Sequence, residues 1–209
     1  MKSLITFVIV LICALSSYGV ELKTGDLLFQ LSGNSDFSKA ISSSTHCGDS
    51  LDFAHVAIVC VEADSLVTVI EASPEEGVRK IDLEAFLSSA PRVGDMPGVV
   101  VKRLQTDFSP ADVIENAKKH IGEEYDWWYM PDNAKMYCSE LVYECYLDAE
   151  GMHIFEARPM NFRNSDGSMP DFWVRLYDSL GIAVPEGISG TNPNDLSKDA
   201  ALVEIYRFF

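Results

Sequence analysis

Basic residues are scarce in this chain. Its 209 residues include 16 lysines and arginines against 32 aspartates and glutamates, which gives a formal net charge of −16. A surface of this charge repels the phosphates of nucleic acids and the headgroups of anionic lipids. We therefore expect no nucleic-acid partner.

Long apolar runs are also scarce, and the longest lies at the very start. Leu4 to Leu15 is apolar apart from Thr6, follows Lys2 and is closed by the small residues Ser17 and Gly19. This pattern is typical of a cleaved export signal, and the run is too short to span a bilayer permanently. We expect residues 1–19 to be removed, no membrane-spanning segment to remain, and the mature protein to be periplasmic or secreted.

Repeats, low-complexity tracts and long linkers are absent from the rest of the sequence, so residues 20–209 are expected to form one domain. Several short β-branched or aromatic runs predict strands, and two amphipathic segments predict helices. The expected strands are 25–29, 53–61, 66–72, 78–81, 99–104 and 201–208, and the expected helices include 83–88, 110–121 and 138–149. This order favours an α+β domain around an antiparallel sheet.

Cysteines are few, and Cys13 belongs to the predicted export signal. The other four are Cys47, Cys60, Cys138 and Cys145, which an exported protein is able to pair. Cys60 lies in an apolar strand and Cys145 on an apolar helix face, so both are expected in the core. We expect no disulfide framework and a free thiol at Cys138.

Cys138 begins the predicted helix 138–149. Leu141, Val142 and Cys145 follow it by three, four and seven residues and share its apolar face. A thiol at a helix N-terminus lies where unpaired N–H groups and the helix dipole favour the thiolate. The pattern indicates a nucleophile, and its alternative is a small hydrophobic core residue.

Only four histidines are available as a base for such a nucleophile. His55 interrupts the apolar strand 53–58 and, if buried, needs a partner for its ring nitrogens. His46 lies in a polar loop, His120 ends a helix as a solvated cap, and His153 lies in a loop with no evident partner. His55 is therefore the candidate base, and its alternative is a core imidazole bonded to the backbone.

Glu71 lies near the end of the next predicted strand and is the candidate partner of His55. A three-residue loop at 62–64 would place the two residues directly opposite each other on one face. A four-residue loop would place them on opposite faces. The alternative for Glu71 is a strand-end carboxylate that faces water.

These residues occur in an order that resembles a known family. The matching motifs are Gly25–Phe29, His55–Ile58, Glu71–Ala72, Gly122–Asp126 and Tyr137–Val142, with a similar tail at 184–193. The order is similar to that of the YiiX-like family, circularly permuted relatives of the NlpC-type papain-fold hydrolases. In the unpermuted relatives the cysteine helix precedes the histidine strand. The resemblance implies a permuted papain-like α+β fold, with an antiparallel sheet or small barrel packed against helices.

The resemblance also implies roles for four residues. Cys138 would be the nucleophile that forms a thioester acyl-enzyme, His55 the general base and then acid, and Glu71 the group that orients His55. The N–H of Cys138 would stabilise the oxyanion, helped by the hydroxyl of Tyr125, a candidate substrate-binding residue. The alternative for Tyr125 is an aromatic residue packed against the helix. No cofactor or metal is expected.

Three further segments are candidates for the walls of a cleft. Trp127 and Trp128 belong to an aromatic loop that suits either a binding groove or the core. The segments 161–171 and 187–192 are candidate walls, and the sequence does not show which way they face.

The leading functional hypothesis is an exported cysteine peptidase or amidase that acts on a peptide or amide. Peptidoglycan-derived cell-wall peptides are the leading substrate class by family analogy alone. Alternatives are a lipid acyl hydrolase or acyltransferase on the same fold and a catalytically silent binding module. A metal site of His46, Cys47, Asp49 and His55 is a further alternative, but its spacing matches no standard ligand pattern.

Overall fold

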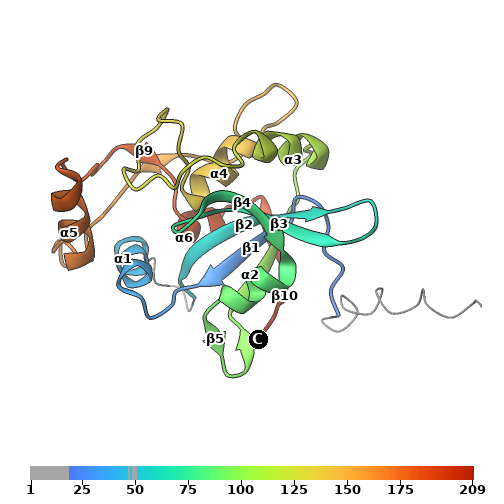
Figure 1. Cartoon of the computed structure of the whole chain (residues 1–209), viewed down its shortest axis with the longest axis horizontal. Helices are drawn as coiled ribbons and strands as arrows, with labels where there is room; N and C mark the ends of the chain where they lie inside the picture. Colours follow the sequence, from blue (N-terminus) through green and yellow to red (C-terminus); the bar gives the residue numbers. More distant parts are fainter. Residues whose placement is uncertain (1–18, 47, 49–50) are drawn as a thin grey trace, which may run out of the picture.

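A six-stranded antiparallel sheet with helices on both faces forms the centre of the molecule (Figure 1). The computed structural model describes residues 19–46, 48 and 51–209, so residues 1–18 of the predicted export signal lie outside the described part, as do Cys47 and Asp49. The sheet order is β10-β7-β1-β2-β3-β4. Its strands are β1 (Leu27–Leu31), β2 (Phe53–Val61), β3 (Val67–Ser73), β4 (Gly77–Asp82), β7 (Val99–Leu104) and β10 (Leu202–Arg207).

Each face of the sheet has its own hydrophobic core because successive side chains of a strand point to opposite faces. Leu27 and Phe29 of β1 pack on one face, and Leu28 between them packs on the other. The first face carries α1 (Asp36–Thr45), α3 (Pro110–Lys119), α4 (Cys138–Cys145), α5 (Asp171–Leu180) and α6 (Pro193–Ser197). The second face carries α2 (Leu83–Ser89). The predicted α+β architecture is confirmed.

The helix that begins at Cys138 is shorter than expected. It ends at Cys145 rather than near residue 149. Tyr146 is fully buried with an extended backbone, and its hydroxyl donates to the carbonyl oxygen of Gly25 at 2.9 Å. This anchor turns the chain out of the helix, and Leu147 then forms a β-bridge with His153. Helices α5 and α6 were not expected from the sequence.

The predicted register of the β2–β3 hairpin is wrong. The loop has five residues, 62–66, and the ladder joins Val61 to Val67 and ends at Ile58 and Ile70. Continued beyond its end, this register would place Ser73 rather than Glu71 opposite His55. An odd loop length still keeps His55 and Glu71 on one face, as diagonal rather than direct neighbours.

Two close approaches position the segments around α4. Gly77 has φ +70°, and a Cβ there would lie 2.1 Å from the carbonyl oxygen of Glu123, so only glycine fits where the β3–β4 turn meets the chain before Tyr125. The short strands β8 (Arg158–Pro159) and β9 (Ser189–Gly190) pair antiparallel and bring 160–162 beside 186–188. The remaining strands, β5 (Arg92–Val93) and β6 (Met96–Pro97), form a separate hairpin.

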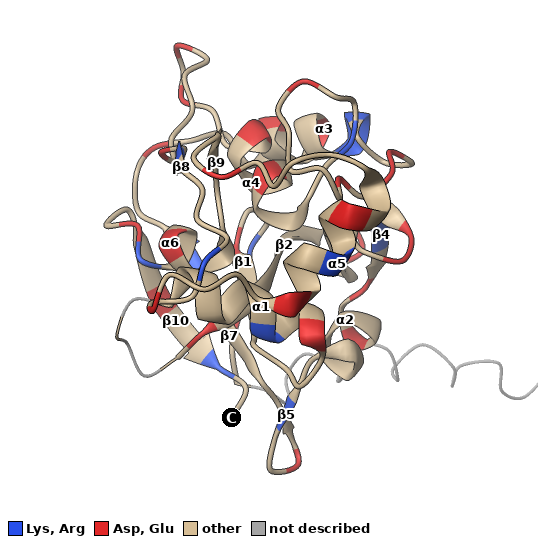
Figure 2. Ribbon diagram, turned by 90° about the vertical axis from the view of Figure 1, so that its left-hand side faces the viewer, with Lys and Arg blue, Asp and Glu red and all other residues tan. Residues whose placement is uncertain are grey.

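The negative charge is spread over the molecule rather than gathered at one place. Figure 2 shows acidic positions on several helices and loops, with basic positions among them. Ion pairs such as Arg207 with Glu204 and Lys118 with Glu115 join neighbouring positions on the surface. No helix among the described residues is long and apolar enough to cross a membrane.

Candidate active site

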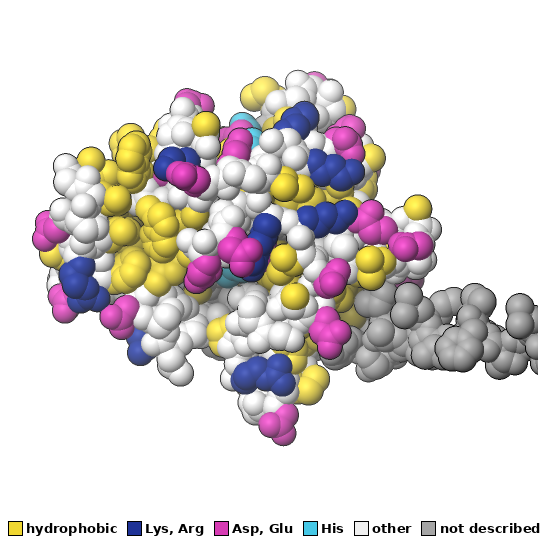
Figure 3. All heavy atoms as spheres, in the orientation of Figure 1, with side chains coloured by type: hydrophobic (Ala, Val, Ile, Leu, Met, Phe, Trp, Pro, Cys, Tyr) yellow, Lys and Arg dark blue, Asp and Glu magenta, His cyan; other side chains and the backbone are white. Residues whose placement is uncertain are grey.

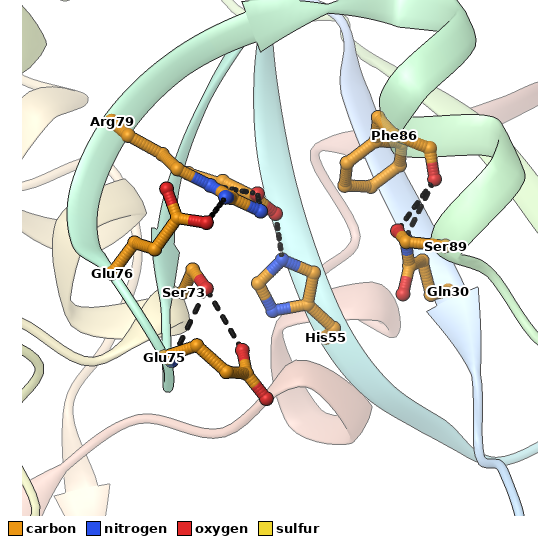
Figure 4. A network of polar contacts seen from close by, with 9 residues as sticks. Gln30, His55, Ser73, Glu75, Glu76, Arg79, Phe86 and Ser89 are labelled. Carbon is orange, nitrogen blue, oxygen red and sulfur yellow. Dashed lines mark hydrogen bonds and ion pairs between the residues drawn. The ribbon is translucent and has the colours of Figure 1, made fainter.

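His55 and Glu71 meet where the sheet opens. Strands β2 and β3 separate beyond Ile58 and Ile70, and both residues lie past this last pair. The Nε2 atom of His55 is 2.6 Å from Oε2 of Glu71, and the two side chains are only 15% and 5% exposed (Figure 4). The His55 ring also packs against Phe86 of α2, with 5.9 Å between ring centroids. The contact with Glu71 occupies Nε2 of His55 and leaves Nδ1 for a second partner.

Arg79 fixes Glu71 from the adjacent strand. It lies directly opposite Glu71 in the β3–β4 ladder, and its Nε and Nη2 atoms are 2.9 Å and 2.8 Å from Oε1 of Glu71. The same guanidinium pairs with Glu76 at 2.6 Å (Figure 4). Burial favours the neutral acid, but the hydrogen bonds from His55 and Arg79 hold the pKa of Glu71 below its ordinary value.

Sequence reasoning missed Arg79. A basic residue two positions after the β3–β4 turn at Gly77 was the available signal, because a tight hairpin makes it the cross-strand neighbour of Glu71. Both oxygens of Glu71 are therefore occupied, one by the imidazole and the other by the guanidinium. This arrangement fixes the orientation of the carboxylate.

The N-terminus of α4 brings Cys138 close to His55. Cys138 is the first residue of α4, which packs against β2 and β3, and it is buried. Burial of the imidazole opposes protonation, but hydrogen bonding to Cys138 and to Glu71, together with their charges, raises the pKa of His55 to about 10. The site thus favours a protonated imidazole beside the Glu71 carboxylate.

Glu140 caps the helix that carries Cys138. It is buried, and its Oε2 atom accepts the backbone N–H of Tyr137 at 3.3 Å. Burial, with the nearby charges of Asp126 and Glu144, raises the pKa of Glu140 to about 8 despite that hydrogen bond. The carboxyl group is therefore largely neutral near pH 7.

Replacing Glu140 with glutamine is expected to reduce the fall in the free energy of unfolding between pH 5 and pH 8. The unfolded chain loses the proton of Glu140 near pH 4.5, whereas the folded chain keeps it to about pH 8. The stabilisation from the neutral Glu140 carboxyl group is therefore complete below pH 4.5. It declines between pH 4.5 and about pH 8, by about 1.4 kcal/mol per unit of pKa shift. Urea unfolding of both proteins at pH 5 and pH 8 measures the difference, and parallel curves would contradict the assignment. Glutamine keeps an acceptor for the N–H of Tyr137.

A narrow pocket opens beside the thiol, and we call it the Cys138 pocket. Its volume is about 40 Å³. Tyr125 lines it, is buried, and its hydroxyl lies 3.3 Å from the hydroxyl of Tyr129. A β-bridge between Tyr125 and Met136 holds Tyr125 next to the start of α4. Tyr125 therefore packs in the core and also lines the pocket.

The two tryptophans after Tyr125 have different environments. Trp127 is half-buried, and its ring lies 4.9 Å from that of Tyr125 and 5.2 Å from that of Phe37. Trp128 is 43% exposed, so the core interpretation fails for it. On the face of the molecule drawn in Figure 3, hydrophobic side chains gather towards the part where α5 lies in Figure 1. Asp126 shapes the loop by accepting the backbone N–H groups of Trp128 and Met130 at 2.9 Å and 2.8 Å.

Both candidate wall segments face the Cys138 pocket in part. From 161–171 the pocket is lined by Asn161 and Phe162, and from 187–192 by Thr191 and Asn192. Pairing of β8 with β9 brings these two segments together. Met160 also lines the pocket and was not expected from the sequence.

Each of the other three histidines has a partner of its own. Nδ1 of His46 lies 2.8 Å from Asp52, and Nδ1 of His120 lies 2.9 Å from Glu123. His153 does have an orienting neighbour, contrary to expectation: it stacks on Tyr143 with 3.9 Å between ring centroids and bonds its carbonyl oxygen at 2.9 Å. None of these three residues lines the Cys138 pocket.

Cys60, Cys138 and Cys145 are free thiols. In the described part of the chain, no group of three or more His, Cys, Asp or Glu side chains is arranged to hold a metal ion. Two members of the alternative metal site, Cys47 and Asp49, lie outside the described residues.

Comparison with known proteins finds a family that matches most of the chain. The family described as "Permuted papain-like amidase enzyme, YaeF/YiiX, C92 family" matches residues 21–206. The chain belongs to this family. The predicted YiiX-like relationship and the permuted papain-like fold are confirmed, and the family consists of papain-like amidases or peptidases.

Two relatives of the permuted family illustrate the similarity. The uncharacterized protein YiiX of Escherichia coli K12 is 25% identical over 178 residues, which is 84% of this chain and 81% of that protein. A crystal structure described as the metalloprotein YiiX from Escherichia coli O157:H7 superposes with a TM-score of 0.71 at 25% identity. The match covers 88% of this chain and 97% of that one.

Proposed function

We propose that this protein is an exported cysteine hydrolase that cleaves an amide bond through Cys138, His55 and Glu71. The observation that carries the proposal is the position of His55, whose Nε2 lies 2.6 Å from Glu71 and whose pKa is raised by both Cys138 and Glu71. A nucleophile, a base and a group that orients the base form the minimal machinery for acyl transfer.

The reaction proceeds through two half-reactions. The Cys138 thiolate attacks the amide carbonyl, and the N–H groups at the start of α4, which lack intrahelical partners, stabilise the oxyanion. The C–N bond breaks as His55 gives its proton to the leaving amine, and a thioester remains on Cys138. His55 then takes a proton from water, whose oxygen attacks the thioester. The C–S bond breaks, which releases the carboxylic acid and restores the Cys138 thiolate beside protonated His55.

The substrate and the location of the protein rest on analogy and on the sequence. Membership of an amidase family supports a peptide or amide substrate, and a peptidoglycan-derived peptide fits an exported member. Export itself is supported by the apolar start of the chain. Tyr125 belongs to the substrate-binding wall in this proposal because it lines the pocket beside Cys138.

Metal chemistry enters no step of the proposal. The YiiX protein of that crystal structure is described as a metalloprotein. The described residues of this chain offer no cluster of three or more suitable ligands, so they do not fit a metal centre.

Selective alkylation of Cys138 tests the proposal. Brief treatment with limiting iodoacetamide at pH 7, followed by intact mass and peptide mapping, is expected to label Cys138 at least tenfold faster than Cys60 or Cys145. These two are internal controls because burial raises the pKa of both thiols, that of Cys145 to about 12. Cys138→Ser is expected to lose this fast label and all amide hydrolysis. Equal labelling of the three cysteines, or hydrolysis by Cys138→Ser, would contradict the proposal.

A further inference from the structure

Glu71 is paired with its neighbours in the sheet on one side. The β2–β3 ladder ends at Ile58 and Ile70, so it does not extend to Glu71 and His55. On the other side the β3–β4 ladder continues past Glu71, and Arg79 is its direct partner. The position of the Glu71 carboxylate relative to His55 therefore depends on side-chain contacts, and β4 supplies one of them.

The guanidinium of Arg79 is held at both ends. Its Nε and Nη2 atoms lie 2.9 Å and 2.8 Å from Oε1 of Glu71. Its Nη1 atom lies 2.6 Å from Glu76 (Figure 4). Oε2 of Glu71 is left for Nε2 of His55 at 2.6 Å. A planar fork of this kind fixes the plane of a carboxylate, whereas a lysine ammonium is a point charge on a flexible stem.

Burial makes a cation beside Glu71 necessary. A buried carboxylate with no cation beside it takes up a proton. In the described part of the chain, His55 and Arg79 are the two cationic side chains that bond Glu71. His55 changes its charge during the proposed reaction, whereas a guanidinium keeps its proton throughout.

The difference matters in the acyl-enzyme, where His55 is neutral because it has given its proton to the leaving amine. To take a proton from water, His55 needs a lone pair on Nδ1 and keeps its remaining proton on Nε2, which donates to Oε2 of Glu71. A protonated Glu71 would instead donate to Nε2. The ring proton would then lie on Nδ1, where it blocks proton transfer from water.

We infer that Arg79 is a positioning residue, which keeps Glu71 an ionised and correctly oriented acceptor while His55 is neutral in the acyl-enzyme. Arg79 acts through Glu71 and not on the substrate. Its loss is therefore expected to slow hydrolysis of the acyl-enzyme more than its formation. This role rests on the proposed function.

The charged and ionisable side chains around Glu71 come from several elements. They are His55 on β2, Glu75 in the β3–β4 turn, Arg79 and Glu76 on β4, and Cys138 on α4, which acts on His55. Glu75 accepts a hydrogen bond from Ser73 at 3.0 Å, and α2 adds the uncharged ring of Phe86 beside His55. Arg79 is thus the positive charge beside Glu71 that the reaction leaves unchanged.

Substitutions of Arg79 with glutamine and lysine test this role, with p-nitrophenyl acetate as the probe and Cys138→Ser as the background. The burst of nitrophenolate reports formation of the acyl-enzyme, and the steady rate reports its hydrolysis. Arg79→Gln is expected to keep the burst, lower kcat by about tenfold or more, and move the acid limb of kcat to higher pH by about one unit, because Glu71 then protonates more readily. Arg79→Lys keeps the charge and the acid limb but is expected to lower kcat by about threefold or more, because the fork is lost.

Arg103→Gln is the matched control. Arg103 is 25% exposed and holds the buried carboxylate of Asp26 at 2.6 Å and 2.8 Å, much as Arg79, which is 28% exposed, holds Glu71. It lies on β7, which β1 separates from β2. Arg103→Gln is expected to lower the thermal midpoint and to leave the burst, kcat and the acid limb unchanged.

The outcomes separate the two proposals. A wild-type kcat and acid limb in Arg79→Gln, changes equal to those of Arg103→Gln, or a burst that falls as much as kcat would overturn the role of Arg79 while the hydrolase remains. If Arg79→Gln does not fold, Arg79→Lys decides, and a wild-type kcat in that variant overturns the role. Release by the wild type no faster than that of Cys138→Ser overturns the hydrolase and the role of Arg79 with it.

Discussion

Replacing His55 with glutamine is expected to lower the kcat/KM of amide hydrolysis by about 10²–10⁴-fold, the usual contribution of a positioned acid–base group. Glutamine can bond Glu71 but can neither accept the thiol proton nor give a proton to the leaving amine. The same variant is expected to slow alkylation of Cys138 near pH 7. Steady-state kinetics and timed iodoacetamide labelling measure the two effects.

The matched control for this change is His120→Gln. His120 also bonds a carboxylate, that of Glu123 at 2.9 Å, but it lies at the end of α3 outside the pocket. It is expected to keep wild-type kinetics. If His55→Gln hydrolyses the amide as fast as this control, with the same thermal midpoint, His55 is not the acid–base group.

Replacing Glu71 with glutamine is expected to lower turnover by about 10²-fold or more. The amide side chain can donate to Nε2 of His55 and so favour the wrong tautomer, an effect known to be severe in hydrolase triads. Loss of the negative charge also lowers the pKa of His55 from about 10, because Glu71 is one of the groups that raise it. The alkaline limb of the kcat/KM profile is therefore expected to move to lower pH by about one unit.

Glu76→Gln provides the control for Glu71→Gln. Glu76 pairs with the same guanidinium at 2.6 Å but is 65% exposed and does not contact His55. It is expected to leave both the rate and the alkaline limb unchanged. An unchanged limb in Glu71→Gln, or an equal shift in both variants, would show that Glu71 does not set the protonation of His55.

Local pattern sufficed to find the candidate nucleophile and base. A cysteine at the start of an amphipathic helix and a histidine inside an apolar strand both break the pattern of their surroundings, and such breaks are visible in a short window. Strands such as Val99–Leu104 and the helix start at Ser109 were also predictable, because β-branched runs and capping residues act locally.

The sequence predicted the contact between His55 and Glu71, but with the wrong register of the β2–β3 hairpin. The hairpin loop proved to be five residues long, and the ladder stops before either residue. Their side chains meet because the sheet opens there and α4 packs against β2 and β3. The length of the hairpin loop decides the register of the two strands. The amino-acid composition does not distinguish a three-residue loop from a five-residue loop.

The sequence by itself determined the family and the candidate reacting groups, because both depend on residue type and motif order. Only the tertiary structure decided what surrounds those groups: Arg79 behind Glu71, and Met160, Phe162 and Thr191 around the thiol. Strand pairing and helix docking bring these residues to Cys138 from distant parts of the chain. Their contacts depend on packing over the whole domain, so no local pattern could have shown them.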